Sequence, residues 1–236
     1  MRAIDHNTIT DAALEQMSST SDPRLKQIME SLVKHLHEFA REVDLTPQEW
    51  LQGITFLTNV GQKCTPFRQE FILLSDTLGF SALINALHDR RATEESTKSS
   101  LLGPFYRQDS PKRELGDSIA SAPRQEVVMY GKITDAKGKP IPNASLEIWQ
   151  TDEDGAYDLQ KQDPSAMDDR GHFHADAQGN YYLRTVVPLG YMIPMDGPVG
   201  DMILAQKRHG YRPSHIHFLV GAPGYRELAT ALYTAG

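Results

Sequence analysis

The sequence predicts an α+β fold in which the helices come before the strands. Apolar residues recur at helical spacing over residues 20–90, and from Glu126 onward short strand-like runs alternate with Gly, Asn and Asp turns. Such segregation is typical of α+β folds, and short strands separated by turn residues favour a β-sandwich. We therefore expect an N-terminal helical region over residues 1–100, which includes the start of a linker, and a β-sandwich domain over residues 101–236.

The helical region carries an amphipathic pattern. Its apolar residues with i, i+3, i+4 and i+7 spacing are Leu25, Ile28, Met29, Leu32, Val33, Leu36, Phe39 and Val43. A capping box with proline at the first helical position, Thr46-Pro47-Gln48-Glu49, predicts a second helix through about Val60. Thr65-Pro66 is expected to open a third helix and Gly79 to end it. The apolar stripe from Leu25 to Phe39 needs a cover, either a second copy of the chain or the β domain.

Four runs in the second half are expected to form strands: Val127–Thr134, Ser145–Gln150, Tyr181–Val186 and His215–Val220. The preceding stretch, residues 91–125, is irregular and rich in Ser, Pro, Gly and charge. Within it, Leu101–Tyr106 places apolar residues around a Gly-Pro turn. This segment is either a plain turn packed on the core or a segment that wraps the next domain and lines a pocket.

Composition narrows the function class. At 236 residues the chain can bury one sizeable core and a smaller accessory element. The net charge is −7 with no basic run, which argues against a nucleic-acid partner. The single cysteine, Cys64, excludes an internal disulfide and fits a reducing compartment. No signal-peptide-like segment and no apolar run of membrane-spanning length is evident, so a cytoplasmic location is expected.

The most informative stretch is Arg212–Phe218, which reads as a strand containing an H-x-H pair. Because side chains alternate along a strand, His215 and His217 point the same way, as a shared metal ion requires. An isolated H-x-H pair is more often two surface histidines. Two tyrosines in Gly-rich or Pro-rich surroundings, Tyr157 and Tyr191, are each more often structural as well. Taken together, the four residues form a possible two-Tyr, two-His metal set.

Such a set has a definite chemical meaning. Neutral imidazole suits Zn, Cu, Fe and Ni. A phenol, with an ordinary pKa of about 10, becomes a ligand only when a strongly Lewis-acidic cation displaces its proton. Two phenolates would neutralise most of a trivalent charge, which favours Fe(III) over Zn(II) or Fe(II). A non-haem Fe(II) oxygenase would instead use two His and one carboxylate.

These residues stand in a chain that resembles the intradiol ring-cleavage dioxygenases. The matching stretches are Arg68–Gly79, Leu102–Tyr106, Gly131–Tyr157, Gly179–Tyr191 and Arg208–Phe218. The resemblance implies a helical dimerisation domain, a mixed β-sandwich catalytic domain and one Fe(III) per subunit. It also implies a small aromatic diol and O₂ as substrates, with both oxygen atoms incorporated, and a homodimer formed through the N-terminal helices. A phospholipid at the dimer interface is a further expectation.

The resemblance also assigns roles to residues. Tyr157, Tyr191, His215 and His217 fall on the four iron-ligand positions, with Tyr191 as the ligand that the substrate displaces. Arg212 falls on the position of an active-site arginine that stabilises negative charge. The residues that match substrate-pocket positions are Leu73, Asp76, Leu101, Gly103, Pro104, Phe105, Ile193, Pro194 and Arg212.

The choice of diol rests on three positions. Ile193–Gly200 resembles the hydroxyquinol and chlorocatechol branches more than the catechol branch. Asp76 is able to accept a hydrogen bond from a third ring hydroxyl, although capping or a turn bond is an equally plain role for it. Ala231 stands where catechol enzymes usually carry glutamine, which weakens the catechol assignment. We expect hydroxyquinol, with catechol or a chlorocatechol as the alternatives.

Two other classes compete with this interpretation. The Gly131–Gly155 stretch alone also resembles non-catalytic prealbumin-like β-sandwich modules, which have no need of the two tyrosines and the H-x-H pair. A zinc hydrolase would want a carboxylate base and an open position among His or Cys ligands.

The intradiol dioxygenase family usually continues some tens of residues beyond the equivalent of Gly236, so the catalytic domain is expected to be incomplete at its C-terminus.

Overall fold

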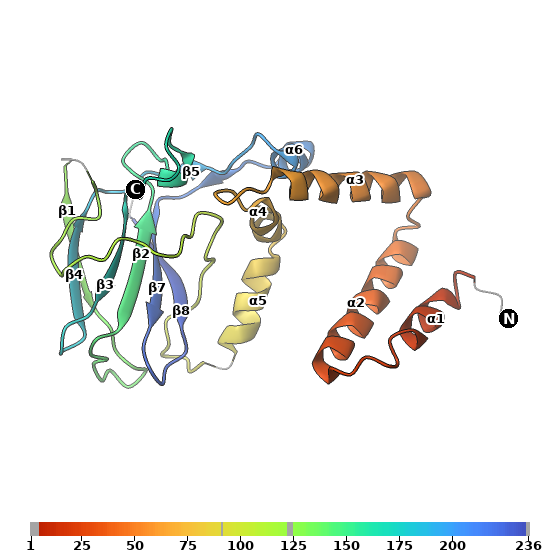
Figure 1. Cartoon of the computed structure of the whole chain (residues 1–236), viewed down its shortest axis with the longest axis horizontal. Coiled ribbons are helices and arrows are strands. Elements are labelled where there is room, and N and C mark those ends of the chain that lie inside the picture. The colour runs from red at the N-terminus through yellow and green to blue at the C-terminus, as the bar shows by residue number, and fades with distance from the viewer. Residues whose placement is uncertain (1–4, 91, 122–124, 235–236) are drawn as a thin grey trace. The chain divides into compact units, whose positions relative to one another are not determined.

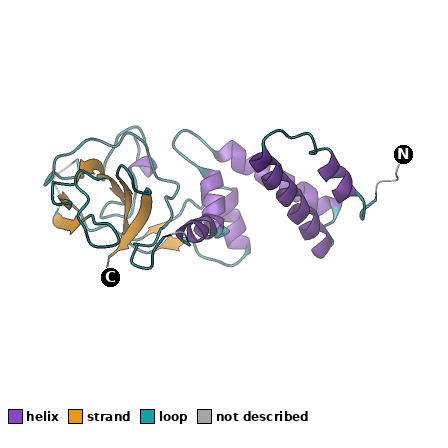
Figure 2. Cartoon of the chain, turned by 90° about the horizontal axis from the view of Figure 1, so that it is seen from below, coloured by secondary structure: helices purple, strands orange, loops and turns teal. Residues whose placement is uncertain are grey.

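The computed structural model describes residues 5–90, 92–121 and 125–234, and the chain forms two compact units, residues 1–57 and 58–236. Figure 2 shows that the strands all belong to the second unit. The predicted α+β class is therefore confirmed, with helices first and a sheet-rich body after them (Figure 1).

The first unit is helical. It contains α1 (Ile9–Glu15), α2 (Pro23–Glu42) and the first part of α3 (Pro47–Lys63). The predicted capping box of α3 is present: the Glu49 carboxylate accepts from the Thr46 backbone N–H at 2.9 Å, and the Glu49 N–H donates to the Thr46 hydroxyl at 3.3 Å. Helix α1 has no prediction from the sequence. It is tied to α2 by Arg41, whose guanidinium donates to the Thr10 hydroxyl at 2.6 Å.

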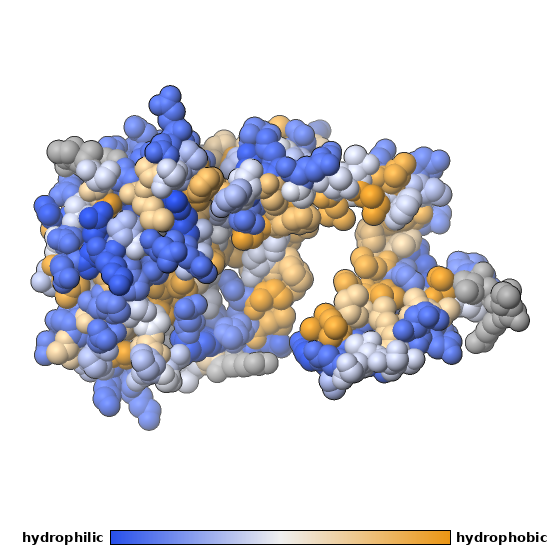
Figure 3. Space-filling model, in the orientation of Figure 1, coloured by the Kyte–Doolittle hydropathy of each residue, from blue (hydrophilic) through white to orange (hydrophobic). Residues whose placement is uncertain are grey.

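The apolar stripe of α2 is left uncovered within this unit. Leu25, Leu36 and Phe39 are each about half exposed, at 49%, 55% and 52%, and orange patches mark these helices in Figure 3. Trp50 and Leu51 on α3 are equally exposed. Exposed apolar patches of this extent ordinarily mark an interaction surface.

The second unit begins with the end of α3, followed by α4 (Glu70–Thr77) and α5 (Phe80–Asp89). The expected helix start at Thr65-Pro66 is wrong. The backbones of Thr65 and Arg68 exchange hydrogen bonds of 2.9 and 3.2 Å, and the Thr65 hydroxyl accepts from the Phe67 N–H at 3.1 Å. These bonds close a turn, so the helix begins only at Glu70. Gly79 ends it in the left-handed region (φ +74°), as predicted, and α5 follows at once.

The strands of this unit are β1 (Val127–Lys132), β2 (Ser145–Gln150), β3 (Arg170–His174), β4 (Asn180–Thr185), β5 (Tyr191–Met192), β6 (Tyr211–Arg212), β7 (His215–Gly221) and β8 (Leu228–Tyr233). They form a β1-β4 pair, a four-stranded sheet in the order β3-β2-β7-β8, and a β5-β6 pair. All pairs of named strands are antiparallel, and among the described residues parallel pairing occurs in two isolated bridges. Helix α6 (Pro198–Ala205) lies between β5 and β6 in sequence.

Strand alternation decides what the four-stranded sheet presents on each face. One face is apolar and packs with β4 residues into the core; its members are Leu146, Ile148, Phe173, Ile216 and Phe218. The opposite face carries Trp149 on β2, Arg170 on β3 and His217 on β7, which pair directly across the strands. We therefore look for metal-binding and catalytic side chains on this polar face of the sheet.

Among the described residues, no single helix has the length and apolarity to cross a membrane. Helices α4 and α5 meet that test only when taken together, across a bend of 71°.

Candidate active site

The two histidines of β7 converge on one point. His215 and His217 are buried, at 9% and 5% exposure, and their Nε2 atoms lie 3.0 Å apart. The Nδ1 atom of His215 lies 2.8 Å from the Pro213 carbonyl, to which it donates, so the Nε2 lone pair faces its neighbour. The ring of His217 stacks on Trp149 with centroids 4.7 Å apart, which fixes its plane.

Both predicted tyrosines lie beside this pair. Tyr157 directly precedes the short 3₁₀ helix Asp158–Gln160 and is fully buried, with its hydroxyl 3.5 Å from Nε2 of His215. Tyr191, on β5, is also buried, and its ring centroid lies 5.1 Å from that of Tyr157. The four predicted ligand residues, separated by up to 60 positions in sequence, thus come together in space.

Burial sets the protonation state of all four groups. It raises the pKa of the Tyr157 phenol well above its usual range and raises that of Tyr191 to about 12. It also lowers the pKa of His215, and that of His217 to well below its usual value. The imidazoles are therefore neutral, as metal ligands must be, and the phenols ionise only beside a strong Lewis acid.

This donor set fits a ferric ion. The two imidazoles supply neutral nitrogen donors, and the two tyrosines, as phenolates, would supply the hard anionic oxygens that a trivalent ion favours. Among the described residues, no three His, Cys, Asp or Glu side chains are placed to share one metal ion, so a four-donor set at this point has to include the tyrosines. A zinc hydrolase would require such a carboxylate or thiolate group.

A buried ion pair between Asp158 and Arg170 holds the backbone next to Tyr157. Asp158, the next residue, accepts from Nε of Arg170 at 2.6 Å, and the same guanidinium donates to the Phe105 carbonyl at 3.2 Å. Phe105 in turn stacks on the Tyr157 ring with centroids 4.4 Å apart. Arg107 adds a second cation 3.4 Å from Asp158. The backbone and the ring of Tyr157 are therefore both held.

Arg212 reaches the site through strand pairing. It lies directly opposite Tyr191 in the β5-β6 pair, and directly opposite residues of antiparallel strands share a face. The charge of Arg212 opposes the effect of burial on the pKa of both the Tyr191 phenol and the Asp76 carboxyl.

A pocket of about 70 Å³ opens over these residues. It is lined by Leu73, Asp76, Ser100, Leu101, Gly103, Pro104, Tyr191, Ile193, Arg212, Pro213, His215, His217 and Tyr233. Gly103 adopts φ +76°, and a Cβ there would lie 3.5 Å from the His217 ring. The left-handed backbone, which side chains rarely adopt, rather than lack of space therefore favours glycine at this position.

Most of the predicted pocket residues line this pocket, but Phe105 and Pro194 do not. Phe105 lies under Tyr157, and Pro194 is half-buried beside Ile193. The lining residues without a prediction are Ser100, Pro213 and Tyr233. The first two adjoin predicted residues in sequence. Tyr233 reaches the pocket because it pairs with His215 across β7 and β8, and the sequence alone does not reveal that register.

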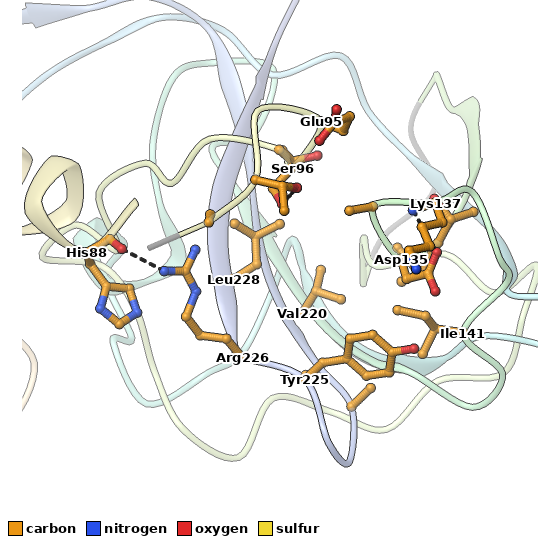
Figure 4. Close-up of a pocket in the computed structure, with 18 residues that line it drawn as sticks. His88, Glu95, Ser96, Asp135, Lys137, Ile141, Val220, Tyr225, Arg226 and Leu228 are labelled. Atoms are coloured by element: carbon orange, nitrogen blue, oxygen red, sulfur yellow. Dashed lines mark hydrogen bonds between the residues drawn. The ribbon is translucent and has the colours of Figure 1, made fainter. Parts of the chain in front are cut away.

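A larger hollow, of about 730 Å³, contains none of the predicted site residues. It lies between His88, residues 92–97, the turn at Asp135 and the β7-β8 connection, in which Arg226 donates to the His88 carbonyl at 2.9 Å (Figure 4). Size therefore does not identify the reactive pocket in this chain.

Comparison with known proteins agrees with the geometry. A family model described as "Dioxygenase" matches residues 102–236, and one described as "Catechol dioxygenase N terminus" matches residues 22–96. The chain is 43% identical over 237 residues to a 6-chlorohydroxyquinol 1,2-dioxygenase of Cupriavidus pinatubonensis, covering 100% of this chain and 86% of the relative. It is 45% identical to a hydroxyquinol 1,2-dioxygenase of Corynebacterium glutamicum, covering 100% and 77%.

Solved structures show the same likeness. A hydroxyquinol 1,2-dioxygenase from Pseudomonas putida superposes with a TM-score of 0.83 at 45% identity, over 97% of this chain and 80% of that one. A catechol 1,2-dioxygenase from Acinetobacter also gives 0.83, at 29% identity, over 99% and 79%. The chain belongs to the intradiol ring-cleavage dioxygenases, an iron-dependent enzyme family. This membership rules out the non-catalytic binding module as an interpretation.

We predict that Asp158→Ala lowers the free energy of unfolding by about 3–5 kcal/mol, because it leaves the Arg170 guanidinium buried, at 1% exposure, without its carboxylate. Urea denaturation measures the change. Asp154→Ala, at an exposed position of the same loop, serves as the control and should shift stability by no more than about 0.5 kcal/mol. Equal effects of the two substitutions would contradict the buried ion pair.

Proposed function

We propose that this chain cleaves hydroxyquinol (benzene-1,2,4-triol) with O₂, between the two adjacent hydroxyl-bearing carbons, at an Fe(III) ion held by Tyr157, Tyr191, His215 and His217, one ion per subunit. The product would be maleylacetate, the hydroxyquinol counterpart of a cis,cis-muconate. The convergence of two buried phenols on two neutral imidazoles carries the metal assignment. When bound, the ferric ion would act as a Lewis acid that activates the diol toward O₂.

The two tyrosines have different roles in this proposal because only one of them lines the pocket. A diol that binds through both oxygens has to lose two protons, and a phenolate oxygen facing the pocket is placed to receive one. Tyr191 lines the pocket, whereas Tyr157 does not and is wedged against Phe105. The raised pKa of Tyr191, about 12 without a metal, makes its phenolate a good proton acceptor. Tyr191 would therefore be the ligand that gives way to the diol, and Tyr157 would be the one that stays.

Arg212 supplies fixed positive charge. Arg212 belongs to the pocket lining, and its charge acts on two other residues of that lining, Tyr191 and Asp76. Negative charge develops on the ring and on the dicarboxylate product, and a preorganised cation in a closed site stabilises it without reorganisation.

Asp76 supplies the substrate preference. It lies in the pocket lining at 9% exposure, on α4. Burial raises the pKa of this carboxyl, while a hydrogen bond from Ser81 and the charge of Arg212 favour its ionised form. A carboxylate there accepts a hydrogen bond from the third ring hydroxyl. The names of the two relatives, hydroxyquinol and 6-chlorohydroxyquinol dioxygenases, point the same way. Catechol and chlorocatechol are the alternative substrates.

The exposed apolar stripe of α2 supports a homodimer through the N-terminal helices, with a phospholipid at the interface as a further proposal. The division of the chain at residues 100 and 101 and the cytoplasmic location remain predictions from the sequence.

The metal assignment predicts that purified wild-type protein is red-brown, because tyrosinate-to-ferric charge transfer absorbs visible light. His217→Ala should lose iron and the visible band. His209→Ala, at an exposed histidine outside the pocket, is the matched control and should keep both. Metal analysis and a visible spectrum of each variant give the answer, and full colour in His217→Ala would remove that residue from the site.

The substrate assignment predicts a higher kcat/KM for hydroxyquinol than for catechol. The hydrogen bond to Asp76 is worth about 0.5–3 kcal/mol, which corresponds to a preference from a fewfold up to about a hundredfold. Asp76→Ala should shrink this ratio and leave catechol turnover nearly unchanged. Asp201→Ala, at an exposed position of α6, should leave the ratio as it is. The assignment fails if the wild type prefers catechol, or if Asp76→Ala lowers both constants equally.

The dimer assignment predicts that the protein sediments as a two-chain particle in analytical ultracentrifugation at micromolar concentration. Leu36→Asp places a charge in the exposed stripe and should give monomers, while Lys34→Asp on the polar side of the same helix should not. A monomeric wild type would refute the proposed interface and leave the stripe to be covered by the rest of the chain.

A further inference from the structure

A second H-x-H pair lies on β3. His172 and His174 point to the polar face of the four-stranded sheet, and their Nε2 atoms are 3.2 Å apart. Their ring centroids are separated by 4.9 Å at an interplanar angle of 70°. The corresponding values for His215 and His217 are 3.0 Å, 4.6 Å and 78°. The β3 pair therefore repeats the arrangement of the active-site pair almost unchanged.

A carboxylate orients the first of these histidines. Glu147, directly opposite His172 across β2 and β3, has its Oε1 atom 2.6 Å from Nδ1 of that ring. A carboxylate only accepts here, so Nδ1 carries the proton and Nε2 of His172 presents a lone pair. Metal-binding histidines usually have such a carboxylate or carbonyl on their other nitrogen, which fixes the tautomer and increases the basicity of the ligand atom.

The spacing suits one small divalent ion. Metal–nitrogen bonds of about 2.0–2.1 Å in tetrahedral geometry place two ligand nitrogens about 3.3 Å apart. The observed separation of 3.2 Å needs almost no adjustment. His174 is exposed, so water has access to the remaining coordination positions. Imidazoles without a phenolate suit Zn(II), Ni(II) or Cu(II) rather than Fe(III).

We propose that His172 and His174, oriented by Glu147, form a second metal site for a divalent ion of the zinc, nickel or copper type. The site lies on the edge strand of the sheet and is separate from the pocket over Tyr191. Glu147 precedes Trp149 by two residues, and Trp149 stacks on His217, so the two sites share one face of β2. The proposal does not depend on the identity of the ring substrate.

Equilibrium dialysis of the iron-loaded enzyme against Zn²⁺, with iron and zinc counted by elemental analysis, tests the proposal. The wild type should take up one zinc per chain in addition to its iron. His174→Ala, at an exposed position, should bind that zinc at least about tenfold more weakly, and Glu147→Gln about 10–100-fold more weakly. His35→Ala, at an exposed histidine of α2, is the matched control and should bind it as the wild type does.

A Cu²⁺ spectrum gives a readout that activity does not affect. Electron paramagnetic resonance of the copper-loaded wild type should show hyperfine coupling to imidazole nitrogens, lost in His174→Ala while the far-ultraviolet circular dichroism stays unchanged. If His174→Ala proves to be misfolded, Glu147→Gln decides by the same two measurements. Absence of zinc uptake by the wild type, or retention of wild-type affinity in the folded variants, would overturn the site.

Discussion

The catalytic unit depends on one constraint: the phenols of Tyr157 and Tyr191 and the imidazoles of His215 and His217 are buried next to one another. Burial opposes charge on every one of these groups, raising the pKa of both tyrosines and lowering that of both histidines. Without a metal ion, these four groups are neutral and form few hydrogen bonds. The proposed trivalent cation would reverse this balance, because a strong Lewis acid displaces phenolic protons and compensates the charge of buried phenolates. The protein supplies the four donor groups, and the proposed cation would supply the positive charge that stabilises the phenolates.

The scaffold holds these donors by two different means. Strand alternation points His215 and His217 to one face, since the intervening Ile216 is part of the core on the other face, and the Pro213 carbonyl and the Trp149 ring then fix the two imidazoles. Tyr157 lies outside any strand and depends on the Asp158–Arg170 ion pair and on the Phe105 ring. The contrast suggests that substitutions at Arg170 disturb the tyrosine more than the histidines. Arg170 and Trp149 lie in one cross-strand row with His217, so the support and the ligands belong to the same piece of sheet.

The sequence predicted the parts of this arrangement that depend on local pattern. Period-two alternation identified the H-x-H strand, and the Thr46–Glu49 capping box identified the start of α3. The helix start predicted at Thr65-Pro66 was wrong, because a turn there satisfies the same backbone groups that a helix would use. The residue types made the four donors a possible metal set, and the family resemblance assigned them to one site, because no local signal brings Tyr157 next to His215. Tyr233 was missed for the same reason, since its place in the pocket follows from the β7-β8 register.

A crystal structure of the iron-loaded enzyme, with anomalous scattering recorded at the iron edge, tests the central claim most directly. The account predicts one strong anomalous peak per chain within about 2 Å of the Tyr157 and Tyr191 oxygens and the Nε2 atoms of His215 and His217. A peak at any other donor set, or a peak that lacks both tyrosine oxygens, would contradict it.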